Sequence, residues 1–155
     1  MSAMIEATPV IRPAITALPK GDSCVLVIFG ASGDLTQRKL IPALYDLACM
    51  GCTHPQFQVL GIGRTKMTSE QFRARMHDAA AASNETRSYS EEKWAEFQKR
   101  MFYLVGDAND PNFYALLSAR LEEMRNSGSS GNHLFYVSTP ASVAQPIIQG
   151  LGARG

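Results

Sequence analysis

A glycine turn directly after an apolar run is the first feature of this sequence that could do chemistry. Val25-Leu26-Val27-Ile28-Phe29 is apolar throughout and passes at once into Gly30-Ala31-Ser32-Gly33. Such a run fits a strand buried on both faces of a parallel sheet. Gly30 and Gly33 let the backbone turn sharply and approach a ligand without a Cβ in the way. The N–H groups that open the following helix would then point at an anion such as a phosphate.

The spacing of these glycines departs from the G-x-G-x-x-G dinucleotide fingerprint. Gly30 holds the first position, but Ser32 and Leu35 replace the second and third glycines. The G-K-[ST] end of a P-loop is also absent, which excludes that phosphate-binding motif. The glycines alone are therefore compatible with nucleotide binding and also with a plain tight connection between strand and helix.

Polar side chains beside the turn have an ordinary interpretation and a functional one. We expect Asp34, at the opening of a helix, to cap that helix and complement its dipole rather than to act as a catalytic carboxylate. Ser32 and Thr36 carry hydroxyls that can reach phosphate oxygens or form local hydrogen bonds.

Arg64 is the second residue that indicates a ligand. It follows an expected strand as Gly63-Arg64-Thr65-Lys66, with no acidic residue there. In a dinucleotide-binding unit this place faces the adenosine ribose, where an acid accepts from the 2′-OH of NAD and an arginine accommodates the 2′-phosphate of NADP. A guanidinium can bond a phosphate through two donors, so the local chemistry favours NADP over NAD.

Cys49, Cys52 and His54 form a C-x-x-C pattern with a nearby histidine, which can bind zinc or exchange disulfides. Only three potential ligands lie close together, and the pair sits at the end of an expected helix, whereas thiolate activation uses a helix N-terminus. We interpret these residues as a helix terminus and predict no metal site.

Strand patterns alternate with helix patterns along the chain. We expect strands at about 24–29, 57–61, 102–105 and 133–138. Helices are expected between the strands. The first should have a kink before Pro42, and the second should open with a capping box of Thr68 and Gln71. A third is expected over about 91–100. Two more expected helix starts are Asp110 as N-cap with Pro111 as first helical residue, and a cap at Ser142. This alternation predicts an α/β, Rossmann-like, doubly wound parallel sheet with strand order 3-2-1-4.

Length and composition limit the classes of function. The 155 residues predict a mobile, proline-rich arm at 1–21 and one domain at 22–155. A net charge of +1 gives no field for nucleic acid or an anionic membrane, and no apolar run approaches the length of a membrane span. Glu6, Arg12 and nearby prolines argue against a signal peptide, and three cysteines are too few for a disulfide framework. We therefore expect a cytoplasmic protein.

The longer segment Gly30-Ala31-Ser32-Gly33-Asp34-Leu35-Thr36-Gln37-Arg38-Lys39-Leu40-Ile41-Pro42-Ala43-Leu44 closely resembles the first strand–helix unit of glucose-6-phosphate dehydrogenases, G-A-S-G-D-L-A-x-R-K-L-x-P-A-L. The resemblance continues through Val59-Leu60-Gly61-Ile62-Gly63-Arg64, Tyr103-Leu104-Val105-Gly106-Asp107, Leu134-Phe135-Tyr136-Val137-Ser138-Thr139-Pro140 and Gln149-Gly150-Leu151-Gly152. It covers about residues 23–155. Ala141 stands where the family usually has a second proline.

The resemblance implies NADP as cofactor and a set of residues that contact it: Gly30, Ala31, Ser32, Gly33, Asp34, Leu35, Thr36, Arg64, Asp107 and Ala108. For Asp107 and Ala108 a simple turn at the end of a strand is the alternative. The family oxidises glucose 6-phosphate to the 6-phosphogluconolactone with hydride transfer to NADP.

The family's R-I-D-H-Y-L-G-K-E and E-K-P segments, which supply its catalytic histidine and a lysine, do not occur in this sequence. His54, His77 and His133 lie outside any matching motif. We therefore assign no catalytic residue and expect an N-terminal portion of a longer, homo-oligomeric enzyme that alone is inactive. The alternative is a free-standing module that binds or senses NADP without chemistry.

Overall fold

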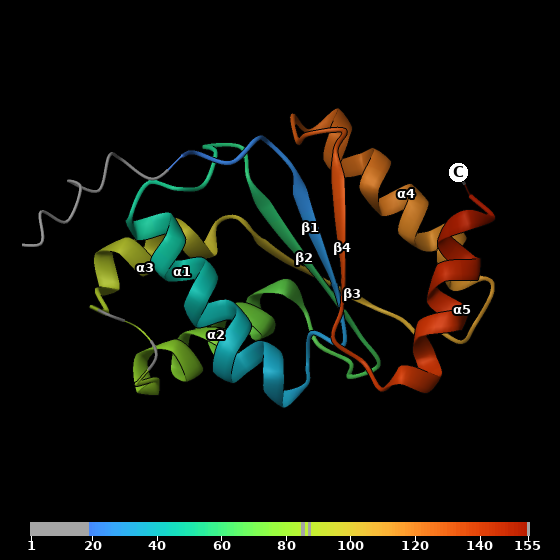
Figure 1. Cartoon of the computed structure of the whole chain (residues 1–155), viewed down its shortest axis with the longest axis horizontal. Coiled ribbons are helices and arrows are strands. Elements are labelled where there is room, and N and C mark those ends of the chain that lie inside the picture. Colours follow the sequence, from blue (N-terminus) through green and yellow to red (C-terminus); the bar gives the residue numbers. More distant parts are fainter. Residues whose placement is uncertain (1–18, 85, 87, 155) are drawn as a thin grey trace, which may run out of the picture.

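The computed structural model describes residues 19–84, 86 and 88–154, and within them the chain forms one parallel sheet between two layers of helices (Figure 1). The strands are β1 (Val25–Phe29), β2 (Gln58–Gly63), β3 (Met101–Val105) and β4 (His133–Val137). Their order is β3-β2-β1-β4, and every neighbouring pair is parallel. The predicted fold class and strand order are confirmed. Residues 1–18 of the expected arm lie outside the described residues.

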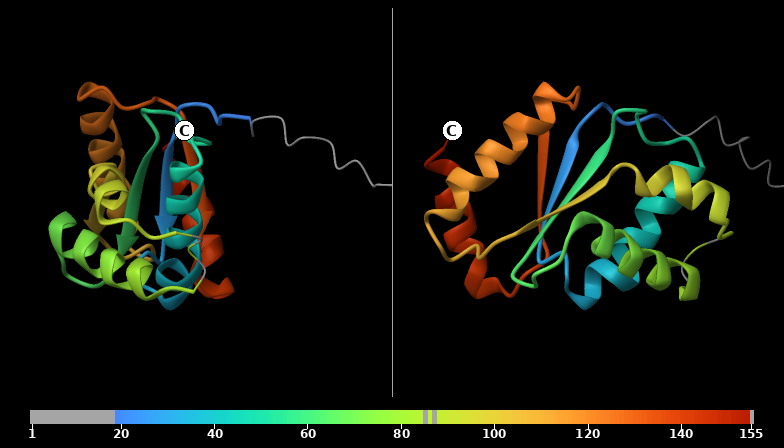
Figure 2. Two further views of the ribbon diagram at one scale, coloured as in Figure 1. Left: turned by 90° about the vertical axis from the view of Figure 1, so that its left-hand side faces the viewer. Right: turned by 180° about the vertical axis from the view of Figure 1, so that it is seen from behind.

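The two faces of β1 build two separate cores because successive side chains of a strand point to opposite faces. Leu26 and Ile28 pack toward α1 (Ile41–Cys49), α2 (Ser69–Ala82) and α3 (Glu91–Gln98). Val25, Val27 and Phe29 pack toward α4 (Phe113–Asn126) and α5 (Ala141–Gly152). The right-hand view of Figure 2 shows these two groups of helices on opposite sides of the sheet. All five residues of β1 are buried, as the apolar run predicts.

Two expected helix features near the site are confirmed. Gln71 N donates to Thr68 Oγ1 at 3.1 Å and Thr68 N donates to Gln71 Oε1 at 2.9 Å, which is the capping box that opens α2. Pro42 lies in the first turn of α1, directly after a π-helical turn, η1 (Thr36–Leu40). Since proline has no N–H to donate, the wider turn before it is the local distortion that the sequence predicts.

Two expected helix starts are wrong. The helix after β3 begins at Phe113, with Asn112 as N-cap, and Asp110 instead forms a turn: its Oδ1 accepts from Asn112 N at 3.0 Å and its carbonyl from Phe113 N at 3.0 Å. Asp110 thus bonds the backbone two residues on, an alternative open to any aspartate near a helix start. The last helix begins at Ala141 after Pro140 with no side-chain cap, so Ser142 is not its N-cap.

The strand β4 is an uncovered edge of the sheet. It pairs only with β1 among the described residues, and all five of its residues are exposed. Leu134 is 59% and Phe135 is 38% exposed, although both belong to types that usually lie in a core. An apolar edge strand is a site where another chain or segment adds.

Candidate functional site

A crevice of about 600 Å³ opens at the carboxyl ends of the four strands. Its lining comes from four segments, each at or just beyond the end of a strand: 29–33, 62–65, 106–109 and 138–143. The chain order of the strands reverses between β1 and β4, because β2 and β3 follow on one side of β1 and β4 lies on the other. Ligands bind at this switch point in open parallel sheets because the connections on either side of it leave in opposite directions.

Gly30 makes the close approach at the floor of the crevice possible. Its φ is +84°, in the left-handed region that favours glycine. A Cβ at this position would lie 2.9 Å from the carbonyl carbon of Ser138, and closer still to its oxygen. The turn after β1 therefore packs backbone to backbone against the end of β4, and only glycine fits.

The turn uses some of its own N–H groups and leaves others for a ligand. The N–H groups of Gly30 and Ala31 both donate to the Ile62 carbonyl at 2.9 Å, and Gly33 N donates to Gly30 O at 3.0 Å. The N–H groups of Ser32, Asp34 and Leu35, by contrast, have no protein partner among the described residues. Since Asp34 and Leu35 begin the helical run that continues into α1, these donors lie at the positive end of a helix.

The Asp34 carboxylate has a local ion-pair partner. It accepts from Arg38 Nε at 2.7 Å and lies 2.6 Å from Arg38 Nη2, one helical turn away, and both side chains are exposed. This pair takes the place of the expected capping bond, because the described structure gives Asp34 no bond to a backbone N–H. Arg38 reduces the repulsion that an acid at the helix start would exert on an anion.

Of the ten residues predicted to contact a cofactor, six line the crevice: Gly30, Ser32, Gly33, Arg64, Asp107 and Ala108. The side chain of Ala31 is fully buried in the core beside Phe72. Thr36 is also fully buried, and its Oγ1 donates to Gly30 O at 3.4 Å, so it supports the turn from beneath. Asp34 and Leu35 are exposed beyond the lining and offer the crevice only backbone groups.

Arg64 follows the last residue of β2 and is exposed at the mouth of the crevice. Its guanidinium makes no hydrogen bond or ion pair with any other residue that the structure describes. It is also the one cationic side chain in the lining, and Asp107, at the end of β3, is the one acidic side chain. An uncommitted guanidinium at this end of β2 is able to bind a phosphate through two donors.

The end of β3 forms a rigid turn at the crevice. Asp107 Oδ1 accepts from Asn109 N at 2.9 Å, and Asp107 O accepts from Asp110 N at 3.0 Å. The hydroxyl of Tyr114, on α4, donates to Ala108 O at 2.7 Å. The position of this turn is therefore fixed from two sides before any ligand arrives.

Several crevice residues were not predicted from the sequence, namely Thr65, Asn109, Ser138, Thr139 and Val143. All of them lie at the end of an expected strand or a few residues beyond it, so the rule that carboxyl ends meet at one edge of a parallel sheet could have found them. Thr139 is notable because its Oγ1 is buried and has no hydrogen-bond partner in the described chain.

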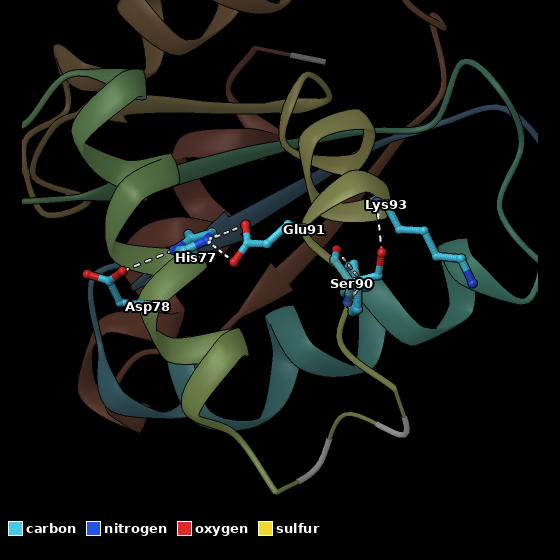
Figure 3. A network of polar contacts seen from close by, with 6 residues as sticks. His77, Asp78, Ser90, Glu91 and Lys93 are labelled. Atoms are coloured by element: carbon cyan, nitrogen blue, oxygen red, sulfur yellow. Dashed lines mark hydrogen bonds and ion pairs between the residues drawn. The ribbon is translucent and has the colours of Figure 1, made fainter.

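None of the three histidines lines the crevice. His77, on α2, bonds Asp78 Oδ1 at 3.0 Å and Glu91 Oε2 at 2.9 Å, so it joins α2 to the start of α3 (Figure 3). These two carboxylates raise the pKa of His77. His133 opens β4, at the opposite end of the strand from the crevice, and partial desolvation of its ring, together with the charge of Arg125, lowers its pKa.

The cysteine pattern leads to no site in the described chain. His54 Nδ1 accepts from the N–H of Gln56 at 3.1 Å, and the thiol of Cys52 points to Met50 O at 3.9 Å. Within the described ranges, no three His, Cys, Asp or Glu side chains are placed to hold a metal ion. No helix among the described residues has the length and apolar character to cross a bilayer.

Comparisons with known proteins agree on one family. The model of the family described as glucose-6-phosphate dehydrogenase, NAD binding domain, matches residues 27–155. The glucose-6-phosphate 1-dehydrogenase of Chlamydia muridarum is 38% identical over 135 residues, which are 86% of this chain and 27% of that protein. The chloroplastic glucose-6-phosphate 1-dehydrogenase 1 of Arabidopsis thaliana is 34% identical over 131 residues, which are 84% of this chain and 23% of that protein.

Solved structures extend the likeness to three dimensions. A glucose-6-phosphate dehydrogenase in complex with its substrate glucose-6-phosphate superimposes with a TM-score of 0.73 at 27% identity, over 89% of this chain and 28% of that one. The glucose-6-phosphate 1-dehydrogenase of Mycobacterium avium gives a TM-score of 0.72 at 26% identity, over 85% of this chain and 27% of that one. The chain thus spans about a quarter of the length of these relatives. With a family model that covers most of its residues, it belongs to the glucose-6-phosphate dehydrogenases, as their NAD-binding domain.

Proposed function

We propose that this chain binds NADP in the crevice at the ends of its strands, as the cofactor-binding part of an enzyme that oxidises glucose 6-phosphate to 6-phosphogluconolactone. The observation that carries the choice of NADP is Arg64, an exposed and unpaired guanidinium at the end of β2 with no acid in the same loop. An acid there would accept from the 2′-OH of NAD, whereas a guanidinium complements the 2′-phosphate of NADP.

The residues present fit such a cofactor. The N–H groups of Ser32, Asp34 and Leu35, which have no partner among the described residues, would bind the pyrophosphate, and Gly30 lets the turn that carries them pack against the end of β4. The turn at Asp107 and Ala108 would border the adenosine half, beside Arg64. When bound, NADP supplies the nicotinamide ring that accepts the hydride. Thr36 and Ala31 would contribute by supporting the turn, since their side chains are buried beneath it.

Oxidation of the sugar needs more than a cofactor site. A base must reach the hydroxyl at C1, and cations must hold the sugar phosphate. The crevice contains no histidine and no lysine, so we propose that these groups come from other parts of the full-length enzyme. We further propose that the enzyme is cytoplasmic and homo-oligomeric. Nothing in the comparisons favours a free-standing NADP sensor.

The test is a pair of titrations. NADP and NAD are titrated by calorimetry against the parent chain, Arg64→Ala and the control Arg125→Ala, which removes another exposed arginine at a distance from the crevice. Loss of one charge-assisted contact should weaken NADP binding by roughly ten- to a hundredfold. Affinity for NAD should change little, and Arg125→Ala should affect neither cofactor. Equal losses for NADP and NAD in Arg64→Ala, or tighter binding of NAD by the parent, would refute the assignment.

A further inference from the structure

A tyrosine below the crevice connects two of the segments that form it. Tyr103 lies on β3 with only 6% of its surface exposed, and its ring packs on Phe72 of α2 with 5.1 Å between ring centroids. Its hydroxyl donates to the carbonyl of Thr65, in the loop after β2, at 2.9 Å. The hydroxyl of Ser32, from the turn after β1, approaches the same place: a Cβ at Gly63 would lie 2.6 Å from Tyr103 Oη and 2.8 Å from Ser32 Oγ.

This contact fixes the backbone of Arg64 from its C-terminal side. On the N-terminal side, the carbonyl of Gly63 accepts from Gly106 N at 2.9 Å, which continues the pairing of β2 with β3. On the other side, the carbonyl of Thr65 is held by Tyr103. The residue that carries the free guanidinium therefore lies between two anchored carbonyls, although all of 64–66 are exposed.

Tyr103 itself does not line the crevice. Burial raises the pKa of its phenol, so the hydroxyl stays protonated and remains a donor at neutral pH. Its effect on a ligand would therefore pass through Thr65 and Arg64 rather than through direct contact.

We propose that Tyr103 is a positioning residue for cofactor selectivity. Its hydroxyl holds the loop 63–66 in place, so that the Arg64 guanidinium can bind the 2′-phosphate of NADP. This inference rests on the proposed function, because it assumes that Arg64 binds that phosphate. A loop that is already ordered loses less conformational freedom on binding. NAD has no 2′-phosphate for Arg64 to bind, so its affinity should not depend on the position of Arg64. The Tyr103 hydroxyl should therefore strengthen the binding of NADP and leave that of NAD nearly unchanged.

The experiment uses Tyr103→Phe in the full 155-residue chain, with Tyr45→Phe as the matched control. Tyr45 is also buried, and its hydroxyl bonds backbone too, donating to Ser90 O at 3.2 Å and accepting from Ser90 N at 3.0 Å, but it does not line the crevice. Calorimetry should show NADP affinity about three- to tenfold weaker in Tyr103→Phe, the range expected for one hydrogen bond, and NAD affinity within about twofold. Tyr45→Phe should keep the parent's ratio of the two affinities.

A double-mutant cycle with Arg64→Ala tests whether the hydroxyl acts through the arginine. If it does, Tyr103→Phe should have no further effect on NADP affinity once Arg64 is removed, because coupled residues are not additive. Amide hydrogen exchange of the free chain gives a readout that needs no ligand: exchange at residues 64–67 should be faster in Tyr103→Phe and unchanged in Tyr45→Phe. Exchange also shows whether the rest of the variant is folded.

The possible results distinguish a failure of the role of Tyr103 from a failure of the proposed NADP binding by Arg64. A selective loss of NADP affinity that disappears in the Arg64→Ala background supports the inference. Equal losses for NADP and NAD, an unchanged NADP affinity, or additive effects in the cycle would overturn it while Arg64 keeps its own role. If Arg64→Ala leaves NADP binding intact in the otherwise unchanged chain, the proposed function fails, and the inference fails with it.

Discussion

Gly30→Ala should destabilise the fold far more than an alanine at another glycine of the same backbone conformation. Two costs add at Gly30: a φ of +84° costs a non-glycine residue about 1–2 kcal/mol, and the new Cβ collides with the backbone of Ser138. Overpacking of this kind adds about 1–3 kcal/mol. The collision cannot be relieved cheaply, because Ser138 N donates to Phe29 O at 2.9 Å and so ties β4 to β1 at this point.

Gly51→Ala is the control for this prediction. Gly51 has a φ of +72°, but a Cβ there would meet nothing within 4 Å, so only the conformational cost of about 1–2 kcal/mol applies. Urea unfolding followed by circular dichroism gives the free energy of unfolding of parent and both variants. We expect a loss at least about 1 kcal/mol larger for Gly30→Ala than for Gly51→Ala, since overpacking alone adds that much. Equal losses would show that the glycine turn does not need its close approach to β4.

Two further predictions concern the pH dependence of stability at His77 and the lack of dehydrogenase activity in this chain alone. Asp78 and Glu91 raise the pKa of His77, so the stability that protonated His77 contributes is fully present below its unfolded pKa of about 6.5 and is lost as pH rises through its higher folded pKa. Unfolding free energies of parent and His77→Gln should therefore differ most at acidic pH and converge at alkaline pH; a gap that is independent of pH contradicts this. The purified chain, supplied with glucose 6-phosphate and NADP, should produce no NADPH by absorbance; turnover that is lost on mutation of His54, His77 or His133 would overturn the view that the catalytic groups lie elsewhere.

The sheet was predictable because its strands carry their own signals. The apolar run at 25–29 and the alternation of strand and helix patterns were enough for the order β3-β2-β1-β4. Helix starts were less predictable: Thr68 and Gln71 formed the expected capping box, whereas Asp110 bonded into a turn before α4. A sequence shows that an aspartate can cap, but the choice between cap and turn depends on how the chain enters the helix.

The candidate site was predictable in its position more than in its chemistry. Sequence patterns located the Gly30 turn and Arg64, because each lies at the end of a strand. They did not show that Thr36 is buried under the turn, or that Gly30 N and Ala31 N are already bonded to Ile62. The bonds to Ile62 depend on how the turn after β1 meets the end of β2, which only the packed structure determines. The role of Tyr103, 38 residues from Thr65 in the chain, depends on such a contact too.

The most direct test of a cofactor site at this crevice is an NMR titration of the 15N-labelled chain with NADP. We expect the largest amide shifts at Ser32, Asp34 and Leu35, whose N–H groups have no partner among the described residues, together with Arg64 and Ala108 at the adenosine side. The N–H groups of Gly30 and Ala31, already bonded to Ile62 O, should shift less than that of Ser32. Shifts confined to the groove between α4 and α5, around His133 and Gly150, would show that the cofactor binds there and not at the crevice.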